Sequence, residues 1–324
     1  MRRTFVLALV ALTAVAIIGA ASPTGKSENL PRYAADGKLI RPANYREWVF
    51  LSSGLGMNYG PTRDDNGPPM FTNVFVQPEA YRAFQQTGHW PDKTMLMLEV
   101  YGSASNGSIN RAGRFQTDLR AVEAHVKDSS PKGDLWKFYD LGTGLAAAGP
   151  MPDGNPCTQC HTEHGAVENT FVQFYPTLLE VALAKGVVKP TVHIPPSAAR
   201  LHKLIAEQGW EKARAAYLEL RAKDPDADVF AEASLNQLGY ELLDEGKKSE
   251  AVGLFREVAA EHPQSANAQD SLADGYLALG DKQQALAASQ KAIELAPKDT
   301  SLALARQRRV VEAATKRIEQ LSGR

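Results

Sequence analysis

The sequence predicts an α+β domain built on an antiparallel sheet, followed by an all-α domain of helical repeats. Three observations predict this order. Strand-like segments separated by Gly, Asn, Ser and Pro clusters occupy residues 38–190. A proline-rich stretch, KPTVHIPPS, follows, and we place a linker at residues 191–199. Residues 200–324 are rich in Ala, Leu, Gln and Glu, which favour helices, and they repeat with a period of 34 residues.

The first 21 residues have the features of an export signal. The basic MRR precedes an apolar run that ends in small residues, and cleavage is expected after Ala21. That run is about 16 residues long, short of the ~20 that span a bilayer as a helix. We therefore expect a periplasmic protein with a flexible polar leader over residues 22–37 and no membrane anchor after cleavage. The formal net charge of −1 gives no reason to expect nucleic acid as a partner.

Alternating or β-branched apolar segments predict the strands of the first domain. They are TNVFVQ, TMLMLEVYG, RAVEAHVKD and LWKFYDLG. Two helices are also expected in this domain. QPEAYRAFQQTG would begin near Pro78, and TLLEVALAKG would end at Gly186.

The repeats of the second domain have a regular residue spacing. Leu238, Gly246, Ala251 and Pro263 recur as Leu272, Gly280, Ala285 and Pro297. A period of 34, with proline after the second helix of each pair, resembles the tetratricopeptide repeat. A looser copy contains Trp210, Ala213, Tyr217 and Pro225, and a last helix over 300–321 would cap the array. Two roles stay open, a stabilising or dimerising appendage and a groove for a protein partner.

Cys157 and Cys160 are the two cysteines of the chain, and His161 follows them directly. Exported proteins usually pair cysteines as disulfides, but so short a loop would stabilise the fold little. C-x-x-C-H is the attachment pattern of c-type haem, in which both thiols bond to vinyl groups and the histidine ligates iron. We therefore expect one covalent haem c per chain, with His161 as the iron ligand.

The same motif has two other possible uses, a redox pair and a zinc site. A thioredoxin-like redox pair usually lies near a βαβ pattern and opens a helix, whereas this pair follows a Pro/Gly loop after an antiparallel sheet. A zinc site could also recruit His164. Four ligands within eight residues, two of them adjacent, would form a tetrahedron with difficulty.

Several segments resemble the cytochrome P-460 and cytochrome c-prime-beta family over about residues 38–183. They are NYREWVFLSS, VFVQPEAYRAFQQTGHWPDKT, EAHVKD, LWKFYDL and CTQCHTEHGAVENTFVQFYPTL. The resemblance implies an antiparallel sheet domain, usually homodimeric, with one haem c. It also implies that His161 is the proximal ligand and that the opposite side of the iron is open or holds water.

In the cytochromes P-460, a lysine bonded to the porphyrin supports hydroxylamine oxidation. Here Leu98 stands at the position of that lysine, within DKTMLMLE, and Glu99 retains the acid that follows it. Lys93 is close, but it replaces the turn glycine of the family pattern, so its geometry is wrong for the same role. We expect Lys93 to be an exposed lysine in a turn.

Strand alternation extends this comparison to the walls of the haem pocket. If Leu98 faces the haem, Leu96 and Val100 share its face, and Met95, Met97 and Glu99 point away. An apolar wall resembles the cytochrome c-prime-beta branch, in which aromatic side chains cap the iron. The candidates for that role are Phe71, Phe75 and Trp90, each of which could instead pack in the core.

A sixth ligand from the protein would make the iron an electron carrier. The candidates are Met70, Met95, Met97, Met151, His89, His125, His164 and His193. Because His125 alternates with apolar Val122, Ala124 and Val126, we expect it to face outward. The sequence favours an exported haem c protein that binds a small diatomic ligand, nitric oxide above all. The alternatives are oxidation of hydroxylamine or another nitrogen compound, and an electron carrier that docks through its repeats.

Overall fold

A computed structural model describes residues 29–57, 67–130, 133 and 135–323 of the chain. The chain divides into two compact units between Val192 and His193, inside the stretch predicted to be a linker. The predicted export signal over residues 1–21 lies outside the described residues. Within the described ranges, no helix is both long enough and apolar enough to cross a bilayer.

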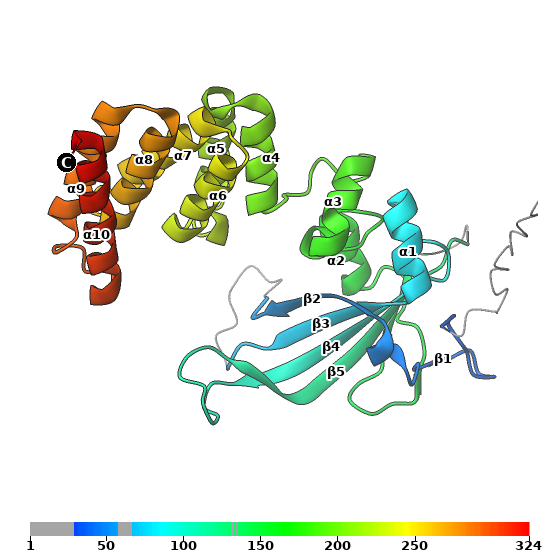
Figure 1. The fold of residues 1–324 in the computed structure, drawn as a ribbon. Helices are drawn as coiled ribbons and strands as arrows, with labels where there is room; N and C mark the ends of the chain where they lie inside the picture. The colour runs from blue at the N-terminus through cyan, green and yellow to red at the C-terminus, as the bar shows by residue number, and fades with distance from the viewer. Residues whose placement is uncertain (1–28, 58–66, 131–132, 134, 324) are drawn as a thin grey trace, which may run out of the picture. The chain divides into compact units, whose positions relative to one another are not determined.

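The first unit contains a five-stranded antiparallel sheet (Figure 1). In spatial order its strands are β2 (Val49–Leu55), β3 (Phe71–Val76), β4 (Met95–Ala104), β5 (Phe115–Lys127) and β6 (Trp136–Asp140). Each strand pairs antiparallel with the next along the chain. This meander, together with the helical second unit, confirms the predicted α+β domain followed by an all-α domain.

Three helices cover one face of this sheet. They are α1 (Pro78–Thr87), α2 (Pro156–His164) and α3 (Pro176–Lys185), and Figure 1 shows them gathered on the same side. The helix predicted near Pro78 and the one predicted to stop at Gly186 are both confirmed. Gly186 ends α3 at a φ of 67°, a conformation that glycine adopts without strain. Between helices and sheet lies a core that includes Phe84, Leu96 and Phe138.

The opposite face of the sheet is also covered. A 3-10 turn, η1 (Tyr45–Glu47), and a two-stranded ribbon of β1 (Leu39–Ile40) and β7 (Ala147–Ala148) pack there against Met95 and Met97.

The described part of the predicted leader, residues 29–37, is fixed to this unit. Asn29 Oδ1 accepts a hydrogen bond from Trp48 Nε1 at 3.1 Å, and Gln77 Nε2 donates to the Asn29 carbonyl at 2.7 Å. Tyr33 forms a bridge with Leu39. Asn29, in the described part of the predicted leader, is therefore hydrogen-bonded to the sheet domain.

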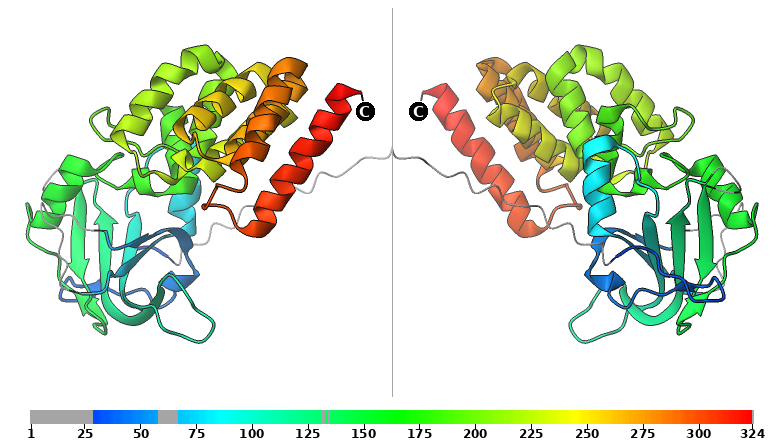
Figure 2. Two further views of the ribbon diagram at one scale, coloured as in Figure 1. Left: turned by 90° about the vertical axis from the view of Figure 1, so that its left-hand side faces the viewer. Right: turned by 90° about the vertical axis from the view of Figure 1, so that its right-hand side faces the viewer.

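The second unit is a stack of antiparallel helices. They are α4 (Ala198–Gln208), α5 (Trp210–Lys223), α6 (Glu232–Asp244), α7 (Lys248–Glu261), α8 (Ala266–Leu279), α9 (Lys282–Leu295) and α10 (Leu304–Ser322), with a 3-10 turn η3 (Asp228–Phe230) after α5. Figure 2 shows the helices side by side, with α10 at the C-terminal end.

The structure explains the 34-residue period. Gly246 and Gly280 form the turns inside two successive hairpins, at φ values of 78° and 90°. Ala251 and Ala285 are fully buried in the second helix of each hairpin. In α10, Val310 packs against the last hairpin, as expected of a cap. These features are consistent with tetratricopeptide-type repeats.

Candidate functional site

Helix α2 carries the C-x-x-C-H motif. Asn155 caps it by accepting a hydrogen bond from the Thr158 amide at 3.1 Å, and Pro156 occupies its first turn. One helical turn separates Cys157 from His161, so the two side chains share a face. Sequence periodicity does not reveal this helix, because CTQCH has no apolar repeat. The two cysteines therefore lie at the start of a helix, as those of a thioredoxin-like redox pair usually do. Their position in the fold does not exclude such a pair.

The burial of α2 differs from that of its neighbours. Every other α-helix in the described ranges buries at least one side chain completely, whereas α2 buries none. Cys157, Cys160 and His161 are all half-buried, and the two thiols are not joined in a disulfide. Half-exposed thiols and an imidazole on one helix fit a porphyrin, which would supply the apolar contact that other helices take from side chains.

The His161 ring is held in an orientation suited to metal binding. Its Nδ1 lies 2.9 Å from the Asn169 carbonyl oxygen. Donation from Nδ1 to this carbonyl leaves the Nε2 lone pair free for a metal. Burial lowers the pKa of His161, which favours the neutral imidazole that iron requires. The rings of Phe171 and Phe138 pack at centroid distances of 4.3 and 4.9 Å and fix the ring plane.

His125 does not face solvent, which corrects the sequence expectation. Its ring lies 4.9 Å from that of His161 and 4.4 Å from that of Phe138. The alternation with Val122 and Ala124 holds, but those residues pack on the other covered face of the sheet. The polar side of β5 is therefore the side covered by α2. Burial, and then the nearby His161, place the pKa of His125 well below its usual value.

A tight hairpin turn presents the carbonyl that binds His161. Val167 and Thr170 form an antiparallel bridge around Glu168 and Asn169, whose φ values are 46° and 60°. Gly165 lets this turn approach α2. A Cβ at Gly165 would lie 2.5 Å from the His161 carbonyl oxygen and 2.6 Å from the Asn169 carbonyl carbon. The absence of a side chain at Gly165 is therefore required for this packing.

The predicted wall residues Leu96 and Leu98 lie on the His161 side of the sheet. Leu96 pairs with His125, and Leu98 pairs with Glu123, so each shares a face with its partner. Leu96 is buried in the core, whereas Leu98 is half-buried. Met95 and Met97 pack on the opposite face, which confirms the predicted alternation.

Two predicted aromatic caps lie on the wrong face. Phe75 pairs with Met97 and packs against the ring of Tyr45 at 6.1 Å, and Phe71 shares the face of Phe75. The strand alternation separates both from Leu98, which corrects the expectation that they line the pocket.

Trp90 and Lys93 both have structural roles in the described fold. Trp90 lies on the helix side but is a core residue, 2% exposed and in contact with Phe84 at a centroid distance of 4.3 Å. Its indole Nε1 donates to Thr170 Oγ1 at 2.9 Å. Lys93 stands in a turn at a φ of 61° and pairs with Asp128 at 3.1 Å, as expected of a surface lysine.

Glu123 is a polar group of this site that sequence reasoning missed. It lies directly across from Leu98 on β5 and shares the face of His125. Burial, and then the nearby Asp140, raise the pKa of Glu123. The available signal in the sequence is that Glu123 alternates with the apolar Val122 and Ala124. Polar positions on a strand usually face water, so this alternation alone does not place Glu123 in a site.

The structure also places the other candidate ligands. Met151 Sδ lies 4.0 Å from Cys157 Sγ, beside one of the two thiols that would bond to a haem. The remaining candidates are elsewhere: Met70 and His164 are exposed, His89 pairs with Glu168, and His193 pairs with Asp224 in the second unit. Burial raises the pKa of both cysteine thiols, whereas a redox-active pair requires a lowered one.

Comparison with known proteins agrees with this geometry. No curated protein shows a significant match to the chain. Residues 42–172 match the family model described as Cytochrome P460, a range that includes the sheet, the motif helix and the hairpin turn. This family implies a haem cofactor, for which Cys157, Cys160 and His161 are the fitting residues. Residues 42–172, within the first unit, therefore match the cytochrome P460 family.

Proposed function

We propose that the first unit holds one covalent haem c and binds a small diatomic ligand, nitric oxide above all. The observation that carries the proposal is the His161 imidazole, fixed by the Asn169 carbonyl at 2.9 Å on the same helix as two free thiols. Cys157 and Cys160 would form the thioethers, and His161 Nε2 would be the proximal ligand. The haem, when bound, supplies a redox-active iron that can take an axial ligand.

The side chains around the site favour a neutral ligand. Leu98 is half-buried on the sheet face that His125 shares, and Leu96 extends the same apolar surface into the core. These two leucines offer a bound ligand no hydrogen bond, which suits nitric oxide because it needs none, and Glu123 and His125 are the polar groups of the same face. Leu98 also has no amine that could bond to the porphyrin.

A second candidate function is oxidation of hydroxylamine or another nitrogen compound. Glu123 favours it, because burial raises the pKa of this carboxyl group, which lies beside Leu98 and can take up and release a proton. This chemistry needs a path for electrons out of the domain. A docked redox protein would provide that path, with the repeats as the docking element.

Cellular location and assembly belong to the same proposal. An export signal at residues 1–21 would bring the protein to the periplasm, where c-type haems are attached. The family resemblance favours a homodimer.

In the second unit, α6, α8 and α10 line a cavity of about 330 Å³, and its lining includes Asn236, Arg306 and Arg309. Asn236 Oδ1 is buried there without a hydrogen-bond partner in the described part of the chain, and we propose this cavity as the place to look for a bound partner.

The absorption spectrum of the purified protein tests the proposal. We expect haem that stays bound after denaturation and a ferrous spectrum of a high-spin, five-coordinate iron that takes up nitric oxide. Replacing Cys157→Ala and Cys160→Ala together should abolish covalent attachment. Glu47→Gln, an exposed change in the same unit, should leave it intact.

Three other outcomes would contradict parts of this function. A low-spin spectrum in both oxidation states would indicate an electron carrier with a sixth ligand from the protein. A displaced Soret band with an extra covalent link to the porphyrin would favour the nitrogen-compound oxidase. A haem that is extracted from the denatured wild-type protein would overturn covalent attachment.

A further inference from the structure

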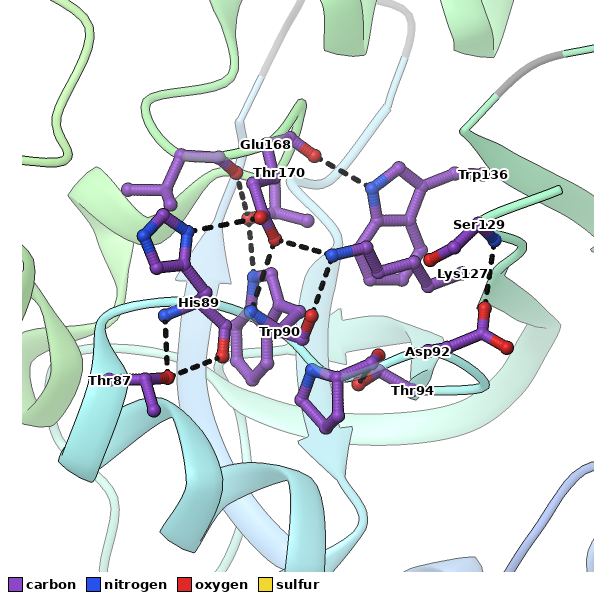
Figure 3. A network of polar contacts seen from close by, with 12 residues as sticks. Thr87, His89, Trp90, Asp92, Thr94, Lys127, Ser129, Trp136, Glu168 and Thr170 are labelled. Atoms are coloured by element: carbon purple, nitrogen blue, oxygen red, sulfur yellow. Dashed lines mark hydrogen bonds and ion pairs between the residues drawn. The ribbon is translucent and has the colours of Figure 1, made fainter. Parts of the chain in front are cut away.

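Lys127 and Glu168 form an ion pair beside the hairpin turn. Lys127 Nζ donates to Glu168 Oε2 at 2.8 Å and to the Trp90 carbonyl oxygen at 2.6 Å (Figure 3). The Lys127 side chain is 8% exposed and that of Glu168 is 24% exposed. A largely buried ammonium group is stable only with such partners, so the geometry of the pair is strongly constrained.

Glu168 is held by three further contacts. Its Oε2 accepts a hydrogen bond from the Trp90 amide at 3.1 Å, and its Oε1 lies 3.1 Å from His89 Nδ1. Its backbone carbonyl accepts a hydrogen bond from Trp136 Nε1 at 2.7 Å. Figure 3 shows these groups converging on Glu168 from separate segments of the chain. Both its side chain and its backbone are therefore fixed.

This fixation compensates for a backbone conformation that glutamate disfavours. Glu168 and Asn169 both have positive φ values, 46° and 60°. Asparagine adopts this region comparatively often, whereas a residue such as glutamate does so rarely and only where its surroundings impose it. The contacts to Lys127 and Trp90 provide that constraint. Without them we expect the turn to relax.

The next residue connects this turn to the proposed iron ligand. The Asn169 carbonyl oxygen accepts the hydrogen bond of His161 Nδ1 at 2.9 Å. We propose that the Lys127–Glu168 pair is a positioning device that sets this hydrogen bond and thereby the electron donation of His161 to the iron. The inference rests on the proposed function, in which His161 ligates the haem iron.

Two single variants separate positioning from simple charge effects. In the haem-loaded full chain, Glu168→Gln removes a negative charge and Lys127→Met removes a positive one. A relaxed turn weakens the Nδ1 hydrogen bond and makes His161 a poorer donor to ferric iron. Both variants should therefore raise the reduction potential and lower the iron–histidine stretching frequency in resonance Raman spectra of the ferrous protein.

A charge effect alone would give a different pattern. Loss of the carboxylate would raise the potential, loss of the ammonium would lower it, and the iron–histidine frequency would stay at the wild-type value. That result would overturn the inference. The double variant Lys127→Met, Glu168→Gln leaves no unpaired charge that could prevent folding. It should still lower the frequency, and an unchanged frequency in it would also overturn the inference.

Asp128→Asn is the matched control. It removes a carboxylate next to Lys127 in sequence and breaks the exposed Lys93–Asp128 pair without touching the hairpin turn. We expect the wild-type frequency in this variant, and a shift equal to that of Glu168→Gln would contradict the inference. Absence of an iron–histidine band in the wild-type protein would instead overturn the proposed function. The two failures are thereby distinguished.

Discussion

At the scale of single residues, the site depends on side chains whose roles follow from their surroundings. The imidazoles of His161 in α2 and His125 in β5 lie 4.9 Å apart, and Nδ1 of His161 is bound to the Asn169 backbone carbonyl. That contact orients its Nε2 as a ligand atom. Glu123 is a carboxyl group on the same sheet face as His125, and burial favours its neutral form.

The titration of Glu123 predicts how pH affects stability. The pKa of Glu123 is raised in the folded unit above its unfolded value near 4.5. Above pH 4.5 the folded state therefore keeps a proton on Glu123 that the unfolded state has lost. The free energy of unfolding consequently falls as pH rises from 4.5 through the folded pKa. Glu123→Gln should raise the free energy of unfolding at pH 7 and change it little at pH 4.

Urea unfolding followed by tryptophan fluorescence checks this prediction. The Cys157→Ala, Cys160→Ala background keeps a haem from quenching the signal of Trp90 and Trp136. Glu47→Gln, an exposed change in the same unit, is the control and should show no such pH dependence. An equal effect of Glu123→Gln at pH 4 and pH 7 would show that its carboxyl group titrates normally.

At the scale of elements, the periodicity of apolar residues predicts the strands and helices that have a covered apolar face. The strands β3, β4, β5 and β6 and the helices α1 and α3 were all predicted, because each repeats apolar residues at its own period. Helix α2 was not predicted, since it buries no side chain and has no apolar pattern to detect. Its cap at Asn155 and Pro156 was the available signal.

The assignment of side chains to faces was harder to predict. Alternation correctly separated Leu98 from Met97, but it cannot tell which face a helix will cover. Both faces of this sheet are covered, so the polar side of β5 looked like a solvent-facing side. For this reason alternation alone places His125 at the surface. It also cannot tell whether Phe71 and Phe75 face the pocket or the opposite core.

The contact between α2 and the hairpin turn predicts the effect of Gly165→Ala. The new Cβ would lie within 2.7 Å of three backbone atoms, so α2 or the turn must move. Overpacking of this kind costs about 1–3 kcal/mol. Thermal unfolding should show a lower midpoint, and the iron–histidine frequency should fall because the His161–Asn169 hydrogen bond lengthens.

Gly149→Ala is the control for this substitution. Its Cβ would meet nothing within 4 Å, so its effect should stay within about 0.5 kcal/mol. Equal midpoints for the two variants would show that the close approach at Gly165 does not hold the turn against α2.

At the scale of the whole molecule, the chain joins two units with separate cores. The sheet unit has one apolar cluster on each face of its sheet. The helical unit has its own clusters, which extend from Leu201 in α4 to Ala314 in α10. The division falls at Val192, next to the prolines of the predicted linker. Each unit therefore has the means to fold by itself.

Separate cores predict two unfolding transitions, and the proposed covalent haem should affect one of them. A haem held by Cys157 and Cys160 would stabilise the folded sheet unit, because its contacts with that unit would be lost on unfolding. In scanning calorimetry, Cys157→Ala with Cys160→Ala should lower the midpoint of one transition and leave the other at its wild-type temperature. The unaffected transition should carry most of the helical circular dichroism signal, since α4 to α10 belong to the second unit. A single transition, or an equal shift of both, would show that the two units unfold together and that the haem stabilises the whole chain.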